Sequence, residues 1–181
     1  MLIIVNGFSC TGKTVLADRL SKKLNLPLFS VDSLKEMIMD SLEGVLSVDA
    51  LFHKYSQFSY NFIYSIAEKL IEVGYSTIIE SSFHNNETNI LRINSLHDTY
   101  GIPVKQIFLY GNKEVVWDRI QKRKKERHSG HTDLTMTYEN FLYKMESSKK
   151  SPLDIKGELL KVDTTYFEKI DLEKIIEFSK S

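Results

Sequence analysis

The sequence predicts a three-layer α/β/α fold built on a five-stranded parallel sheet. Apolar segments with the character of strands alternate with amphipathic segments along the 181 residues, which is typical of a parallel sheet covered by helices. Residues 2–6 begin with a continuous apolar run, as expected of a strand that is buried on both faces. The length suits one hydrophobic core, so we expect residues 1–181 to form a single domain.

The first strand leads through a glycine-bounded loop into a helix at about residues 13–24, where apolar side chains recur at helical spacing. Pro27 precedes a short second strand at residues 28–31. Asp32 or Ser33 is then well placed to cap a further helix.

Two glycines mark expected helix ends in the rest of the chain. Gly74 and Gly101 each follow a helical pattern, and glycine favours helix ends. The remaining elements are expected, in order, as a helix at about 48–73, a strand at 77–80, a helix at about 87–100, a strand at 104–110, a helix at about 113–125, a loop at 126–135, a helix at about 138–147, a strand at 159–162 and a helix at 171–179.

The composition excludes several classes of protein. Lysine plus arginine equals aspartate plus glutamate, at 24 each, so no overall field attracts nucleic acid or an anionic membrane. Cys10 is the single cysteine, which excludes an internal disulfide and fits a reducing, cytoplasmic compartment. Residues 2–6 are too few to span a bilayer and no basic leader precedes them, so we expect no membrane segment.

A phosphate-binding motif follows the first strand. Residues 7–14 are Gly-Phe-Ser-Cys-Thr-Gly-Lys-Thr, a full G-x-x-x-x-G-K-[ST] match placed between an apolar strand and a helix. Glycine lets the backbone curl so that N–H groups point at phosphate oxygens, and the helix dipole adds positive charge. The expected ATP-binding positions in the loop are Gly7, Ser9, Cys10, Thr11, Gly12, Lys13 and Thr14. The Cys10 thiol itself is not needed for this chemistry.

The last two residues of the motif have individual roles. Lys13 can reach the β- and γ-phosphates, which makes it a catalytic candidate. The Thr14 hydroxyl can bind Mg²⁺. The motif therefore predicts ATP and Mg²⁺ as cofactors.

Asp32 follows the second strand, and the carboxyl ends of parallel strands form the functional edge of such a sheet. Its carboxylate can accept the proton of an acceptor hydroxyl, or it can simply cap the next helix; position alone weighs these two interpretations evenly. Lys35 lies one turn further along the chain. It can hold an anionic acceptor group or be a solvated lysine.

Glu80 ends the third expected strand after apolar residues, the arrangement of a Walker B carboxylate. We expect it to be buried and to hold Mg²⁺, through water, or to contact the acceptor. Phe83 and His84 follow directly. They can line an acceptor pocket, with packing and loop decoration as the alternatives.

A basic segment lies near residues 119–135, in a chain of zero net charge. Six of residues 119–127 are basic. Arg119 and Arg123 are four residues apart and share one helix face, and Arg127 continues the row. Such a row can close over a triphosphate as a lid and neutralise charge on the transferred group, with Arg123 and Arg127 as catalytic candidates. The alternatives are a solvated basic helix or a nucleic-acid patch.

Two further sites complete the prediction. His128 and His131 make a weak zinc pair without cysteine or carboxylate partners, so we expect lid-shaping or phosphate contacts from them. The loop after the fifth strand contains Thr164. This loop is a place for adenine to rest against backbone groups.

With these residues identified, the chain resembles the AAA-33-type predicted kinases and is similar to polynucleotide 5′-kinases and chloramphenicol phosphotransferases within the P-loop kinase superfamily. The resemblance rests on residues 7–14, 31–34, 80–83, 119–131 and 163–165. It implies the strand order 2-3-1-4-5 and a general-base role for Asp32. It also places Arg119, Arg123 and Arg127 in the lid, where Ser129 stands in place of the usual proline.

We therefore expect an ATP-dependent kinase that phosphorylates a hydroxyl group of a small molecule. One alternative is a polynucleotide 5′-kinase, which the zero net charge and the lack of a long basic groove disfavour without excluding nucleic acid. Another is a nucleotide-binding switch module with little transfer chemistry.

Overall fold

The computed structural model describes residues 1–41, 48–128, 132–147 and 150–180, with the side chains of residues 48–54, 132 and 133 outside the description. The strands are β1 (Leu2–Gly7), β2 (Leu28–Ser30), β3 (Thr77–Glu80), β4 (Val104–Tyr110) and β5 (Glu158–Asp163). The helices are α1 (Lys13–Leu24), α2 (Val31–Ser41), α3 (Val48–Glu72), α4 (Glu87–Tyr100), α5 (Lys113–Arg123), α6 (Tyr138–Glu146) and α7 (Leu172–Lys180), with short 3₁₀ turns η1 (Thr132–Thr135) and η3 (Phe167–Lys169).

The five strands form one sheet in the order β2-β3-β1-β4-β5. Every adjacent pair is parallel, and β1 at the centre pairs with β3 on one side and β4 on the other. The predicted fold class and strand order are therefore confirmed.

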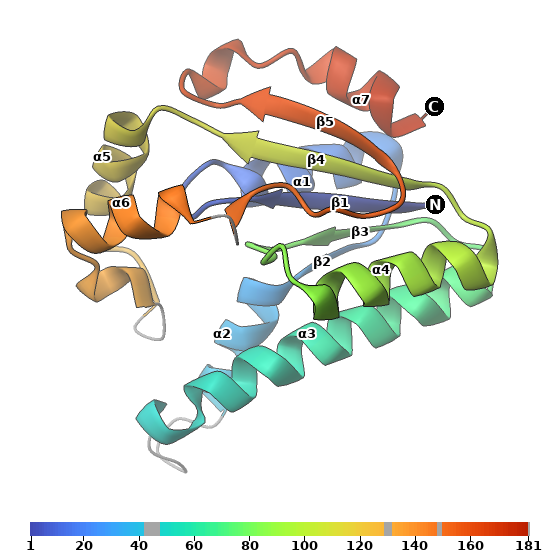
Figure 1. The fold of residues 1–181 in the computed structure, drawn as a ribbon, viewed down its shortest axis with the longest axis horizontal. Coiled ribbons are helices and arrows are strands. Elements are labelled where there is room, and N and C mark those ends of the chain that lie inside the picture. The colour runs from blue at the N-terminus through green and yellow to red at the C-terminus, as the bar shows by residue number, and fades with distance from the viewer. Residues whose placement is uncertain (42–47, 129–131, 148–149, 181) are drawn as a thin grey trace.

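Helices cover both faces of this sheet, because successive residues of each strand point to opposite faces. On one face Leu2 and Ile4 pack with apolar side chains of α3 and α4. On the other face Ile3 and Val5 pack with α1 and α7. Figure 1 shows α3 and α4 together below the sheet. Within the described ranges, none of the helices combines the length and the hydropathy that a transmembrane span requires.

A third cluster lies beyond the carboxyl ends of the strands. Phe8, in the loop after β1, packs edge-on against Phe141 of α6, with ring centroids 5.6 Å apart. Val116 and Ile120 of α5 and Met136 complete this buried group. In Figure 1 the arrowheads of β4 and β5 point toward α5 and α6. This cluster therefore holds the basic segment beside the phosphate-binding loop.

Several element boundaries differ from the prediction. The helix expected at about 113–125 ends at Arg123, and η1 occupies part of the loop expected at 126–135. The second strand ends at Ser30 rather than at Val31, which begins α2. Neither Asp32 nor Ser33 caps α2, so that expectation is wrong. Ser30 precedes the helix and its hydroxyl accepts a hydrogen bond from Ser33 N at 3.4 Å, because serine is itself a favourable N-cap.

Candidate active site

The loop between β1 and α1 depends on two glycines. Gly7 has φ of 149° and Gly12 has φ of 89°, in the region where glycine meets no steric cost. A Cβ atom at Gly7 would lie 2.3 Å from the carbonyl oxygen of Leu109 in β4. No described side chain caps the start of α1, so the first amides of this helix remain available to an anionic group.

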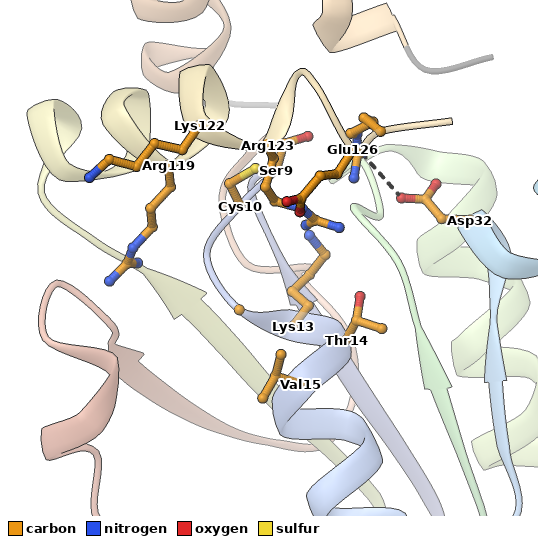
Figure 2. A pocket seen from close by; sticks show the side chains of 12 residues that line it. Ser9, Cys10, Lys13, Thr14, Val15, Asp32, Arg119, Lys122, Arg123 and Glu126 are labelled. Carbon is orange, nitrogen blue, oxygen red and sulfur yellow. Dashed lines mark ion pairs between the residues drawn. The ribbon is translucent and has the colours of Figure 1, made fainter. Parts of the chain in front are cut away.

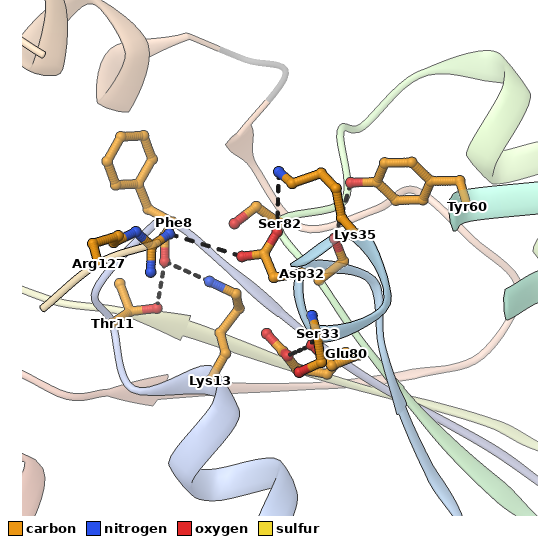
Figure 3. Close-up of polar contacts among 12 residues, drawn as sticks. Phe8, Thr11, Lys13, Asp32, Ser33, Lys35, Tyr60, Glu80, Ser82 and Arg127 are labelled. Carbon is orange, nitrogen blue, oxygen red and sulfur yellow. Dashed lines mark hydrogen bonds and ion pairs between the residues drawn. The ribbon is translucent and has the colours of Figure 1, made fainter. Parts of the chain in front are cut away.

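The side chain of Lys13 lies inside this loop and binds its backbone. Its side chain is buried, and its Nζ donates to the carbonyl of Phe8 at 2.9 Å, while the Thr11 hydroxyl donates to the same oxygen at 2.8 Å (Figure 3). Burial lowers the pKa of the Lys13 ammonium, and the carboxylates of Glu80 and Asp32 oppose this shift. The ammonium thus lies between the loop and two carboxylates.

Glu80 is 1% exposed at the end of β3, so its predicted burial is confirmed. Its Oε2 accepts a hydrogen bond from the Ser30 hydroxyl at 2.7 Å. Burial raises the pKa of the Glu80 carboxyl, while Lys13 and the hydroxyls of Ser30 and Thr14 oppose the rise. A buried carboxylate, a threonine hydroxyl and a lysine therefore meet at the start of α1.

Asp32 lies in the first turn of α2, with its side chain 40% exposed between two cations. Its Oδ1 is 3.8 Å from Lys35 Nζ, and its Oδ2 is 3.9 Å from a guanidinium nitrogen of Arg127 (Figure 3). The alternative that Lys35 is a solvated lysine is wrong, because this residue is 7% exposed. Both cations are thus fixed beside the carboxylate.

One cavity of about 550 Å³ joins the loop to the basic segment. Figure 2 shows Lys13 and Arg123 pointing into the same space, with Asp32 on the side of α2. The lining residues are Ser9, Cys10, Gly12, Lys13, Thr14, Val15, Asp32, Arg119, Lys122, Arg123, Glu126 and Arg127. Residues 7–15 and residues 119–127 therefore enclose one space, large enough for a small ligand.

Arg119 is anchored to the loop after β5. One of its guanidinium nitrogens donates to the carbonyls of Thr164 and Thr165, at 2.8 and 3.0 Å. The Thr164 side chain is buried, and its hydroxyl donates to the carbonyl of Tyr110 at 2.8 Å. The Thr164 hydroxyl is therefore held by β4, and the expected contact of this loop with adenine, through backbone groups, stays a prediction.

Phe83 and His84 do not line this cavity. Phe83 is 1% exposed and packs against the rings of Tyr60 and Tyr64, at 5.6 and 6.1 Å between centroids. It belongs to the core, which corrects its assignment to the acceptor pocket. His84 lines a separate cavity of about 290 Å³. This second cavity is bounded by residues of α3 and by Asn86 at the start of α4.

The histidine prediction is only partly covered by the structure. His128 Nε2 lies 2.8 Å from Asp40 Oδ1 of α2, which fits a role in shaping the segment over the site. His131 and Ser129 lie outside the described residues. In the part of the chain that is described, no three His, Cys, Asp or Glu side chains are grouped to hold a metal ion.

Two residues at the site were missed by the sequence analysis. The hydroxyls of Tyr60 and Ser81 lie 2.9 Å apart, and burial raises the pKa of Tyr60 to about 12. Lys150 Nζ donates to the Ser82 carbonyl at 3.4 Å, and burial lowers its pKa to about 8. The carboxyl end of β3 points to Ser81 and Ser82, but no motif or periodicity marks Tyr60 or Lys150.

Comparison with known proteins identifies a family and a fold for the chain. The sequence matches AAA-33, a family described as an AAA domain, over residues 2–141, and no curated protein matches it. A candidate kinase of known structure from Chloroflexus aurantiacus J-10-fl is 29% identical with a TM-score of 0.83, covering 99% of this chain and 93% of the other.

Two more distant structures share the fold. A gluconokinase from Sinorhizobium meliloti 1021 is 17% identical with a TM-score of 0.55, covering 98% of this chain and 87% of the other. A shikimate kinase from Bacteroides thetaiotaomicron is 17% identical with a TM-score of 0.57, covering 99% and 96%. At these identities the likeness concerns the fold alone.

Proposed function

The chain belongs to the AAA-33 family of AAA domains, and from this premise we propose that it is an ATP-dependent kinase that phosphorylates a hydroxyl group of a small molecule. The observation that carries the proposal is a single cavity lined by Lys13, three arginines of residues 119–127 and Asp32. These are the groups that phosphoryl transfer requires, since its catalysis depends on positioning and charge neutralisation.

The loop of residues 7–14 is the proposed site of the triphosphate. Its glycines create the curved backbone, and the uncapped start of α1 presents N–H groups. Lys13 would exchange its hydrogen bond to the Phe8 carbonyl for phosphate oxygens. The adenine would rest near the backbone of Thr164 and Thr165, beside the guanidinium of Arg119.

The residues around Glu80 fit a bound Mg²⁺. The Thr14 hydroxyl is close enough to the Glu80 carboxyl to oppose the rise of its pKa, so two possible oxygen ligands lie together next to the loop. Magnesium prefers such a site, with one carboxylate and with phosphates completing its shell. When bound, the ion would neutralise charge on the β- and γ-phosphates.

Asp32 is proposed as the general base. The acceptor oxygen forms a bond to the γ-phosphorus while the bond from that phosphorus to the β–γ bridging oxygen breaks, and ADP leaves. Asp32 takes the proton of the acceptor hydroxyl, and the cations of Lys35 and Arg127 lie 3.8 and 3.9 Å from its two oxygens. Arg123 and Arg127 neutralise the charge that develops on the transferred group.

The proposal is tested by ATP consumption over a panel of hydroxyl compounds, scored with Asp32→Asn. Asparagine keeps the shape of the side chain but cannot take the proton, so turnover should fall on the order of a hundredfold while ATP affinity, measured by calorimetry, is unchanged. Asp18→Asn on the exposed face of α1 is the matched control. An Asp32→Asn protein with wild-type turnover would refute the base assignment.

The same assay distinguishes the two alternatives. Transfer of labelled phosphate to a 5′-hydroxyl oligonucleotide, in preference to every small molecule of the panel, would indicate a polynucleotide 5′-kinase. ATP binding without turnover on any acceptor would indicate a nucleotide-binding switch. Loss of ATP binding in Lys13→Met is expected under all three readings and checks that the loop is the nucleotide site.

A further inference from the structure

Lys150 brings a half-buried ammonium close to the acceptor side of the site. It lies between α6 and β5, and its Nζ donates to the carbonyl of Ser82, two residues beyond Glu80. Figure 3 shows Ser82 beside Asp32 and Lys35. The charges of Lys13 and Asp32 both act on Lys150, so its ammonium is close to the groups proposed for transfer.

Hydrogen bonds to two other elements fix the segment that follows Lys150. Asn85, in the loop after β3, donates to the Ser151 hydroxyl at 3.0 Å and accepts from Asp154 N at 3.1 Å. Gln106, buried in β4, accepts from Leu153 N at 2.7 Å and donates to Leu153 O at 3.0 Å. The backbone that directly follows Lys150 is therefore held by tertiary hydrogen bonds.

Three other cations of the site already have carboxylates nearby. Lys35 and Arg127 face Asp32, and Lys13 lies near Glu80 and Asp32. Among the residues that the structure describes, no carboxylate lies within 4.0 Å of Lys150 Nζ. Partial burial disfavours the charged form of the Lys150 ammonium, and the negative charge of a bound ligand would stabilise that form.

We propose that Lys150 binds an anionic group of the acceptor, so that the substrate is a small hydroxyl compound that carries a carboxylate or a phosphate. This inference rests on the proposed kinase function and narrows its substrate class. The anionic group lies away from the hydroxyl that reacts, so its contact is made equally in the ground state and in the transition state. Lys150 is thus a specificity-determining residue. Its loss should raise the KM for the anionic acceptor and leave kcat unchanged.

The experiment compares matched acceptors in an ATP-consumption assay. The panel pairs sugar alcohols and other polyols with the corresponding hydroxy acids and with their phosphate monoesters, so that carboxylate and phosphate are separate arms. The wild-type protein should prefer an anionic member, and Lys150→Met should raise KM for it about 10- to 100-fold, as expected when a charged hydrogen bond is lost. Lys150→Arg should restore most of the affinity. Lys174→Met, in an exposed part of α7, is the control.

The pH dependence separates charge recognition from a structural role. The groups whose charges act on Lys150 are Lys13 of α1, Lys144 of α6 and Asp32 of α2; the two lysines lower its pKa and the aspartate opposes them. The Lys150 ammonium has a pKa of about 8, so in the enzyme without bound acceptor it loses its proton and its charge as the pH rises through 8. KM for the anionic acceptor should therefore rise above pH 8 in the wild type. In Lys150→Arg it should stay flat, because a guanidinium remains charged.

The outcomes are distinct from those of the general kinase proposal. Equal use of neutral and anionic partners by the wild type, or an unchanged KM in Lys150→Met, would overturn the role of Lys150 and leave the kinase intact. A wild-type protein that binds ATP but phosphorylates no member of the panel would overturn both. Calorimetric ATP affinity and circular dichroism of each variant exclude loss of folding as the cause.

Discussion

His128 Nε2 lies 2.8 Å from Asp40 Oδ1, and this contact joins the segment after α5 to α2. The neighbouring Arg127 faces Asp32 on the same helix at 3.9 Å. Arg127 and His128, two successive residues of the basic segment, therefore both contact α2, the helix that carries the proposed general base Asp32. This arrangement places Arg127 at the wall of the cavity.

Removing the contact in Asp40→Ala should loosen the basic segment. Exposed ion pairs contribute little, so we expect trypsin to cleave after Lys124, Lys125 or Arg127 roughly two- to fivefold faster than in the wild type. Mass spectrometry of the fragments measures the rates. Asp18→Ala, which removes an exposed ion pair in α1, should leave them unchanged. A cleavage rate equal to that of the wild type would show that His128 and Asp40 do not restrain the segment.

Gly7→Ala should destabilise the protein through a clash with the central sheet. The new Cβ would lie 2.3 Å from the carbonyl oxygen of Leu109, so β1 and β4 must separate, at a cost of about 3 kcal/mol. Gly74→Ala is the matched control: its φ is also positive, at 88°, but no atom lies within 4 Å. It should cost about 1 kcal/mol. Urea unfolding of both variants measures the difference.

The success of the sequence analysis at the loop and its failure at Lys150 have one physical explanation. The loop is a local structure, in which the spacing of Gly7, Gly12 and Lys13 specifies the backbone that follows a buried strand. The segment that follows Lys150 is held by Gln106 and Asn85. These two residues bind Leu153 and Asp154, from which they are 47 and 69 positions away in the chain. The hydrophobic periodicity of a single segment does not predict hydrogen bonds between residues so far apart in the sequence.

The same distinction explains the errors around β2 and β3. The region after each strand was predicted to carry polar groups to the site, because parallel strands end at one edge. Asp32 and Glu80 followed this rule, whereas Phe83 turned into the core between Tyr60 and Tyr64. The direction of a side chain in a loop depends on the packing that surrounds it, which the local sequence does not specify.

Tyr60→Phe tests the hydrogen bond that supports the end of β3. The phenol lies 2.9 Å from the Ser81 hydroxyl, and its loss leaves Ser81 without this partner, at a cost of about 1 kcal/mol in unfolding free energy. Tyr75→Phe, at a side chain that is 64% exposed, should have no effect. Equal unfolding free energies for the two variants would contradict a structural contribution from the Tyr60 hydroxyl.

Glu80→Gln should change how stability depends on pH. Burial raises the pKa of the Glu80 carboxyl in the native state, so the folded protein retains a proton that the unfolded chain releases near pH 4.3. The stabilisation from this group is present below that pH and is lost as the pH rises through the folded pKa. Glutamine does not titrate, so the unfolding free energy of Glu80→Gln relative to the wild type should increase from pH 5 to pH 7.5 in urea titrations.

A second variant checks the direction of this effect. The Ser30 hydroxyl donates to Glu80 and opposes the rise of its pKa. Ser30→Ala should therefore raise the pKa of Glu80 further and steepen the loss of stability with increasing pH. A relative stability of Glu80→Gln that stays constant across this range would contradict a raised pKa.

Arg119→Lys should weaken ATP binding through the loop after β5. One guanidinium nitrogen donates to both carbonyls, of Thr164 and Thr165. The lysine side chain is one bond shorter, so its ammonium does not reach the position of this nitrogen. The loss of one charged hydrogen bond should free this loop and raise the Kd for ATP on the order of tenfold in calorimetry. Lys125→Met, an exposed residue that does not line the cavity, removes a positive charge from the same segment and should change the Kd by less than about twofold. If both variants weaken ATP to the same degree, the effect of Arg119 is one of overall charge, and its anchoring of the loop contributes nothing to nucleotide binding.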